Sequence, residues 1–139
     1  MAFETAGAAE LFLLGRVLFG GVLAFTGLNH FMNADGMIPY AEAKGLPAPA
    51  ASVYASGGLL VFSGLLVIVG AYPVVAAGAL ASFLLVSAVT MHDFWAVPED
   101  QQQDEMTQFL KNVAMAGGAV ALLAVAGTAW PYSVGLGVF

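Results

Sequence analysis

Four long apolar runs dominate this chain of 139 residues and constrain its fold more than any other feature. They cover residues 11–31, 53–70, 72–91 and 107–129. Each is close to the roughly 20 residues that an α-helix needs to cross about 30 Å of hydrocarbon. None alternates with the period of two expected of a membrane β-strand. The sequence therefore predicts an all-α, polytopic membrane protein: a four-helix transmembrane bundle in one domain, residues 1–139.

The composition agrees with a lipid bilayer as the surroundings. Hydrophobic residues make up 60% of the chain and charged residues 9%, against roughly 45–50% and about 25% in soluble domains. The net charge of −6 argues against nucleic-acid binding, and an acidic surface is typical of proteins in high salt, which suggests a halophilic source. The absence of cysteine excludes disulfides and thiol redox chemistry within this chain.

The first run is expected to stay in the mature protein. Glu4 and Glu10 precede it where a signal peptide carries basic residues, and Arg16 interrupts it. We therefore interpret residues 11–31 as the first transmembrane helix.

The connections divide the bundle into two ends. Residues 32–52 and 92–106 form long connections at one end, here called the polar end. Both termini and a tight turn from Gly70 to Pro73 lie at the other, here called the terminal end. Aromatic residues mark both ends and predict interfacial anchors, with Trp130 at the terminal end and Trp95 at the polar end. Three Lys and Arg residues are too few for the positive-inside rule to orient the chain.

The ionisable side chains gather at the polar end, since all but Glu4, Glu10 and Arg16 lie within or beside residues 29–52 and 91–112. We interpret the acids of residues 99–105 as solvation of a loop. The remaining groups lie on three helix ends at one depth and form the candidate site: Asn29, His30, His92, Asp93, Lys111 and Asn112.

Two interpretations of this candidate site stay open. The side chains either cap helices and hydrogen-bond at the interface, or they exchange protons with a redox ligand such as a quinone. The two histidines also have the chemistry to ligate a haem or, together with Asp93 or Glu42, a metal, but no diagnostic ligand spacing favours either.

Arg16 lies inside the first apolar run and also allows two interpretations. Its long side chain can extend to the headgroups at the terminal end, or it can point into the bundle and bind an anionic or carbonyl-bearing ligand. Gly20, Leu23, Gly27 and His30 lie on the same helical stripe as Arg16. The stripe predicts a groove that admits a ring or a tail.

Small residues spaced four apart predict close packing between helices. The pairs are Gly20 and Ala24, Gly78 and Ser82, and Gly117 and Ala121.

Taken together, the motifs of this chain resemble the DoxX family of small membrane proteins, over about residues 13–123. The resemblance is carried by Arg16, residues 25–31, Gly45-Leu46-Pro47, Gly57-Gly58, residues 91–95, residues 109–112 and Gly117-Gly118. Arg16, Gly27, His92, Lys111 and Asn112 match positions that the family tends to keep.

The resemblance implies a four-helix bundle like that of the vitamin K epoxide reductase type, with cytoplasmic termini. It also implies a link to respiratory redox chemistry through a thiosulfate:quinone oxidoreductase subunit. This chain departs from the family pattern at Ser56, where many members have an acidic residue, and the lack of cysteine rules out the thiol mechanism of the epoxide reductases.

Three functional hypotheses follow, and the residues do not decide whether the chain is an enzyme. The leading one is a quinone-linked or accessory role in membrane redox metabolism. The second is a non-catalytic partner or scaffold subunit, associated with membrane redox subunits or with a second copy of the chain. The third is a small protein that binds a lipid or another hydrophobic ligand in the groove between Arg16 and His30.

Overall fold

The computed structural model describes residues 2–139, and within them it is entirely helical, with no β-strand. The elements in chain order are α1 (Ala8–Met32), α2 (Ala34–Ala43), α3 (Pro49–Val69), α4 (Pro73–Met91), the short 3₁₀ helix η1 (Phe94–Ala96) and α5 (Glu99–Ala124).

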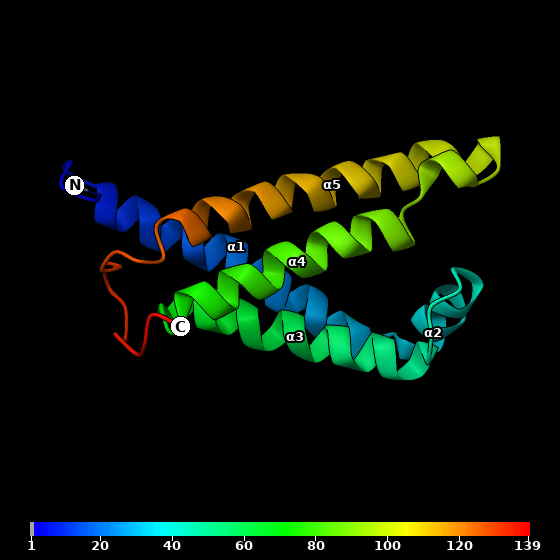
Figure 1. Ribbon diagram of the computed structural model, residues 1–139, viewed down its shortest axis with the longest axis horizontal. Coiled ribbons are helices and arrows are strands. Elements are labelled where there is room, and N and C mark those ends of the chain that lie inside the picture. Colours follow the sequence, from blue (N-terminus) through cyan, green and yellow to red (C-terminus); the bar gives the residue numbers. More distant parts are fainter. Residues whose placement is uncertain (1) are drawn as a thin grey trace.

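The four long helices form two antiparallel pairs, α1 with α3 and α4 with α5, and the pairs meet where α3 packs against α4. Figure 1 shows the pairs diverging towards the polar end, which carries α2 and η1, while both termini lie at the opposite end. The core lies where the pairs meet, around Leu60, Val67, Leu80 and Ala119.

The outside of the bundle is apolar. Leu11 is 69% exposed, Phe62 70% and Val86 60%, and side chains of this kind surround the long helices. Such a surface is unfavourable in water and suited to hydrocarbon. Three segments, Ala8–Met32, Pro49–Val69 and Pro73–Ala96, are long and apolar enough to span a membrane. The chain is therefore a multi-pass membrane protein.

Paired glycines explain the tight packing of α1 on α3. A Cβ atom added at Gly20 would lie 2.4 Å from the carbonyl oxygen of Gly64, and one added at Gly27 would lie 2.5 Å from that of Gly57. The two backbones therefore touch at two levels, as small residues allow between membrane helices. The sequence predicted a groove along the stripe from Arg16 to His30. That prediction is wrong at Gly20 and Gly27, because α3 occupies the space beside them.

The other small-residue pairs do not act in this way. An added Cβ would meet nothing within 4 Å at Gly78 or Gly117. Gly118 is the glycine of α5 that lies close to another helix, where an added Cβ would be 3.1 Å from the ring of Phe19. The glycines of these two pairs therefore make no close contact between helices, and the buried residues of α4 and α5 are mostly alanines.

The predicted tight turn between α3 and α4 is confirmed. Gly70 ends α3 in the left-handed conformation, with φ of 69°, and Pro73 begins α4. Glycine adopts positive φ without steric cost, and proline suits the first helical turn, where its missing N–H is not needed.

Two predicted connections are partly helical. Residues 34–43, within the predicted connection 32–52, form α2 although they include Gly36 and Pro39. The carbonyl that Pro39 leaves unbonded belongs to Asp35, which is exposed and open to water. Helix α5 begins at Glu99 rather than residue 107, because Glu99 and Asp100 in its first turn complement the helix dipole. It ends at Ala124 instead of continuing to residue 129.

The segment after α5 folds back over the terminal end. Its backbone is held to the α3–α4 turn by three hydrogen bonds, Val134 N–H to Val69 O at 2.9 Å, Tyr72 N–H to Leu136 O at 2.8 Å and Val74 N–H to Val138 O at 3.1 Å. These bonds satisfy backbone groups that hydrocarbon cannot.

Arg16 binds the same C-terminal segment from inside the bundle. Its side chain is fully buried, and Nη1 and Nη2 donate to the carbonyl oxygens of Pro131 and Tyr132 at 2.9 and 3.1 Å. The guanidinium carbon lies 5.4 Å from the ring centre of Phe12 and 5.5 Å from that of Trp130. Of the two interpretations of Arg16, extension to the headgroups is wrong, because the side chain is buried and the chain itself supplies its partners. Trp130 is also buried, 6% exposed, and is not an interfacial anchor.

Candidate functional site

A cavity of about 920 Å³ lies between the two helix pairs towards the polar end. Its walls are mostly apolar, with Leu23 from α1, Leu59 from α3, Phe83 from α4 and Met115 from α5. Met37, Tyr40 and Ala41 of α2 contribute on the polar-end side, so the helix that the sequence did not predict forms part of the wall. The volume falls within the roughly 300–1,000 Å³ typical of small-molecule sites.

Eleven polar side chains line the same cavity. They come from every long helix and from α2: Thr26, His30, Tyr40, Ser52, Ser56, Ser87, Thr90, His92, Gln108, Lys111 and Asn112. Polar side chains set in a mostly apolar wall can orient a hydrophobic ligand.

His30 is held against α3. Its Nδ1 lies 2.9 Å from Oγ of Ser56 and 3.3 Å from the carbonyl oxygen of Val53. The Ser56 hydroxyl itself donates to Val53 O at 2.9 Å. The last turn of α1 is thereby fixed to the first turns of α3, and the ring cannot rotate without breaking these bonds.

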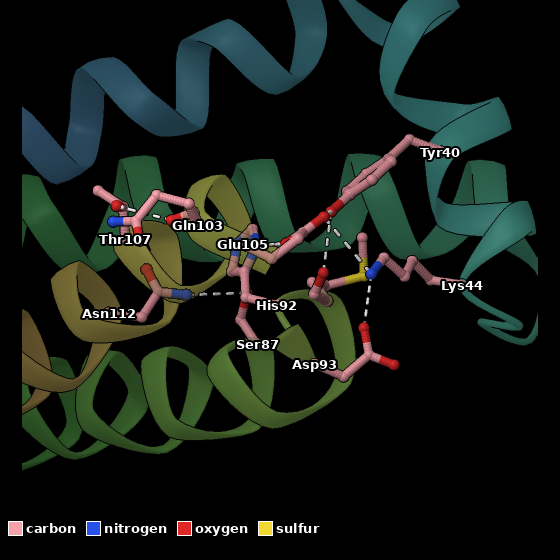
Figure 2. A network of polar contacts seen from close by, with 10 residues as sticks. Tyr40, Lys44, Ser87, His92, Asp93, Gln103, Glu105, Thr107 and Asn112 are labelled. Atoms are coloured by element: carbon pink, nitrogen blue, oxygen red, sulfur yellow. Dashed lines mark hydrogen bonds and ion pairs between the residues drawn. The ribbon is translucent and has the colours of Figure 1, made fainter. Parts of the chain in front are cut away.

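His92 belongs to a network that joins α2, the end of α4 and α5. Its Nδ1 lies 2.9 Å from Oε2 of Glu105, while Oε1 of Glu105 accepts a 2.7 Å hydrogen bond from the Tyr40 hydroxyl. Nζ of Lys44 lies 2.5 Å from Oδ1 of Asp93 and 3.5 Å from Oε1 of Glu105. Figure 2 shows Tyr40 of α2 and Lys44, which directly follows that helix, pointing towards these partners.

The network shifts the pKa values of its members. Burial raises the pKa of Tyr40 well above its ordinary value, and the hydrogen bond to Glu105 adds to the rise. Burial alone would also raise the pKa of Glu105, but the hydrogen bonds from Tyr40 and His92 and the charge of Lys44 outweigh it, so that this pKa is lowered. Glu105 is accordingly ionised and Tyr40 protonated at neutral pH.

The structure brings four of the seven sequence-predicted site residues to the cavity: His30, His92, Lys111 and Asn112. Asn112 donates to Oγ of Ser87 at 3.3 Å, as Figure 2 shows.

The other three lie away from the cavity. Asn29 accepts a side-chain hydrogen bond from Asn33 at the junction of α1 and α2. Asp93 pairs with Lys44, and Arg16 binds the C-terminal segment at the far end of the bundle.

Glu105, Tyr40 and Lys44 are the members of the network that the sequence analysis missed. Glu105 was interpreted as loop solvation, but its side chain is only 12% exposed. Had the helix been started at Glu99, the spacing of Glu105, Gln108 and Asn112 at positions i, i+3 and i+7 would have placed them on one face. No comparable signal marks Tyr40, because α2 was not expected.

The comparisons with known proteins agree with this architecture. The family model described as DoxX matches residues 11–93, more than half of the chain. The chain belongs to the DoxX family. It is also similar to the inner membrane protein YphA of Escherichia coli (strain K12), with 29% identity over 123 residues that cover 87% of each chain. No solved structure matches the chain. The DoxX match contains His30, Tyr40 and His92 and ends before α5, which supplies Glu105 and Lys111.

Proposed function

We propose that this DoxX protein binds a lipophilic quinone-type molecule in the cavity between its helix pairs and has a quinone-linked or accessory role in membrane redox metabolism. The observation that carries the proposal is a cavity of about 920 Å³ whose apolar wall holds two histidines, each fixed through Nδ1. A ring with a tail can bury its carbon skeleton against the apolar wall while its oxygens reach the imidazoles. Lys111, on the same wall, offsets negative charge on the ring.

The route of entry supports a ligand drawn from the bilayer. Val22 and Val86 line the cavity and are also 58% and 60% exposed on the apolar outside of the bundle, so the cavity opens towards the surface that lipid covers. A hydrophobic molecule can therefore pass from lipid to the cavity without crossing water.

We also propose that α5 is a fourth membrane crossing. It has 26 residues, about 39 Å at 1.5 Å per residue, and it lies antiparallel to α4, one of the three apolar segments. It returns the chain to the end that holds both termini. Its acidic first turns, up to Glu105, then lie beyond the hydrocarbon, and residues 106–124 leave about 28 Å of helix to cross it.

The orientation in the membrane stays a prediction of the family resemblance, with both termini in the cytoplasm. The chain has no native cysteine, so single cysteines report topology directly. With Ala6→Cys and Asp100→Cys, both at exposed positions, a membrane-impermeant maleimide added to spheroplasts is expected to label only the Asp100 variant. Labelling of the Ala6 variant alone would show the opposite orientation, with both termini outside the cytoplasm.

The test of quinone binding compares two variants of α4. Ser87 lines the cavity, whereas Ser82 is exposed on the outside of the same helix and does not. Protein purified in mild detergent should carry a quinone, detected by native mass spectrometry and by solvent extraction. Ser87→Phe should fill the cavity and lose the ligand, while Ser82→Phe should keep it. Purified protein without any quinone, and without binding of added quinone, would overturn the proposal.

A second candidate ligand is an amphiphile with an anionic head. Lys111 lines the cavity, and no ion pair engages it within residues 2–139. The same extraction distinguishes this candidate, because a fatty acid or phospholipid recovered in stoichiometric amount, and lost with Lys111→Gln, would replace the quinone. Assembly with membrane redox subunits or with a second copy stays a prediction of the resemblance.

A further inference from the structure

The two histidines of the cavity carry their protons on the same ring nitrogen. At His30 the Ser56 hydroxyl has one hydrogen, which goes to Val53 O, so its oxygen is left to accept from the imidazole. Val53 O, 3.3 Å from Nδ1, is an acceptor as well. An unprotonated Nδ1 would face lone pairs on both sides, and the hydrogen-bond network therefore assigns the hydrogen to Nδ1.

The same holds at His92. Its Nδ1 lies 2.9 Å from Oε2 of Glu105, and an ionised carboxylate can only accept. Glu105 is kept ionised by its further contacts to Tyr40 and Lys44. The hydrogen of the neutral imidazole is therefore on Nδ1 here too.

This arrangement leaves Nε2 of each ring as an acceptor in the neutral form. Neither Nε2 has a hydrogen bond to any of residues 2–139. Three hydroxyls on the cavity wall are acceptors as well. Thr26, Ser52 and Thr90 each donate their hydrogen to a backbone carbonyl, so they can offer a ligand only their lone pairs. Donors on the cavity wall come mainly from α5, from Gln108, Lys111 and Asn112.

We propose that the cavity selects the reduced, hydroxyl-bearing form of its ligand, a lipophilic hydroquinone, over the corresponding quinone. The inference rests on the proposed function and specifies its substrate class. A hydroquinone has two O–H donors to give to Nε2 acceptors, whereas a quinone has only carbonyl acceptors and would leave the imidazole lone pairs unmatched. Unpaired polar groups of this kind cost more than a missing hydrogen bond, so selection by donor polarity is strong.

Such a preference has an electrochemical consequence. Tighter binding of the reduced form raises the midpoint potential of the bound couple, by about 30 mV for each tenfold of preference in a two-electron couple. The protein would thereby hold its ligand in the reduced state at potentials where the free couple is partly oxidised.

The experiment uses three probes with the same decyl tail: a hydroquinone, the corresponding quinone and the dimethyl ether of the hydroquinone. They are titrated anaerobically into the full-length protein at about pH 8.5, where an imidazole of ordinary pKa is neutral, with binding followed by native mass spectrometry and thermal shift. The hydroquinone is expected to bind at least about tenfold tighter than either competitor.

Variants locate the selection. Ser56→Ala should reduce the preference, because it removes one acceptor that keeps the hydrogen on Nδ1 of His30 while leaving the ring in place. Ser63→Ala is the control, on the same helix but outside the cavity wall, and should change nothing. His30→Phe should lower hydroquinone affinity and leave that of the ether unchanged.

The outcomes separate the two proposals. Equal affinity for the three probes, tighter binding of the quinone, or a preference that survives both Ser56→Ala and His30→Phe would overturn the inference and leave quinone-type binding standing. Failure of all three probes to bind would overturn the proposed function itself.

Discussion

The hydroxyl of Tyr40 donates a 2.7 Å hydrogen bond to Oε1 of Glu105, a residue 65 positions further along the chain. Tyr40 lies on α2 and Glu105 near the start of α5, so the bond joins the end of the α1–α3 pair to that of the α4–α5 pair. The same hydroxyl lies 2.9 Å from the carbonyl oxygen of Met91, where α4 ends. Together with Lys44, these contacts tie together the polar end of a bundle that is otherwise open between its pairs.

Removing the charge of Glu105 should destabilise the fold. Glu105→Gln weakens the contacts to Tyr40, His92 and Lys44 at once, and we expect a loss of about 1.5–3 kcal/mol in the free energy of unfolding, the range for hydrogen bonds to charged groups. Glu99→Gln, at an exposed position of the same helix, is the control and should have little effect. Chemical unfolding in detergent measures both; equal losses would show that the network does not join the pairs.

The contribution of Glu105 should depend on pH in the acid range. The pKa of Glu105 is lower in the folded protein than its ordinary value of 4.5, so the ionised form is the one that folding stabilises. The groups that contact the Glu105 carboxylate are Tyr40, Lys44 and His92, and Lys44 is also paired with Asp93. The stabilisation is fully present above about pH 4.5 and is lost as pH falls through the folded pKa. The stability difference between the native chain and Glu105→Gln should therefore shrink below pH 4.5; a difference that grows there would contradict the assignment.

Arg16 should control whether the C-terminal segment stays bound. Arg16→Met removes both donors and leaves the carbonyls of Pro131 and Tyr132 without their partners, at an expected cost of about 2–4 kcal/mol. Arg16→Lys keeps the charge but lacks the planar guanidinium that reaches both carbonyls. Its stability should lie between those of the native chain and Arg16→Met. Chymotrypsin should then cut after Tyr132 faster than in the native chain. Unchanged cleavage in Arg16→Met would show that other contacts hold the segment.

Alanine substitutions should separate packed glycines from lipid-facing ones. In Gly64→Ala the new methyl would lie 2.5 Å from the carbonyl oxygen of Gly20, forcing α1 away from α3 at a cost of about 1–3 kcal/mol. Gly117→Ala meets nothing within 4 Å and should stabilise α5 by about 0.5–1 kcal/mol. Thermal unfolding of the two variants should shift in opposite directions. A shift in the same direction would contradict the glycine contact between α1 and α3.

The apolar runs were sufficient to predict an all-α membrane protein, because hydrocarbon admits few other backbones. Small local features were harder to predict. Pro39 suggested a loop where α2 forms, and the acidic stretch from Glu99 suggested solvent where α5 begins. Charge next to a helix dipole and a hydrated carbonyl decided these boundaries, and neither is a hydrophobic signal.

The candidate site shows the same division. His30, His92 and Lys111 were found because successive crossings of the membrane bring the ends of three helices to one depth. The structure places all three residues on one cavity. Arg16 was misjudged because its partners are backbone carbonyls of a segment more than a hundred residues away, which side-chain patterns do not reveal. Glu105 was missed with the start of its helix.

The central claim is that a quinone-type molecule occupies the cavity between the two helix pairs. The most direct measurement is photoaffinity labelling of the full-length protein in lipid nanodiscs with an azidoquinone, followed by mapping of the cross-linked residues. We predict cross-links on the cavity wall from both pairs, at residues such as Leu59, Phe83 and Met115. Excess unlabelled quinone should suppress them, and Ser87→Phe should abolish them. Cross-links confined to lipid-facing residues such as Phe62 and Val75, and insensitive to competition, would contradict the account.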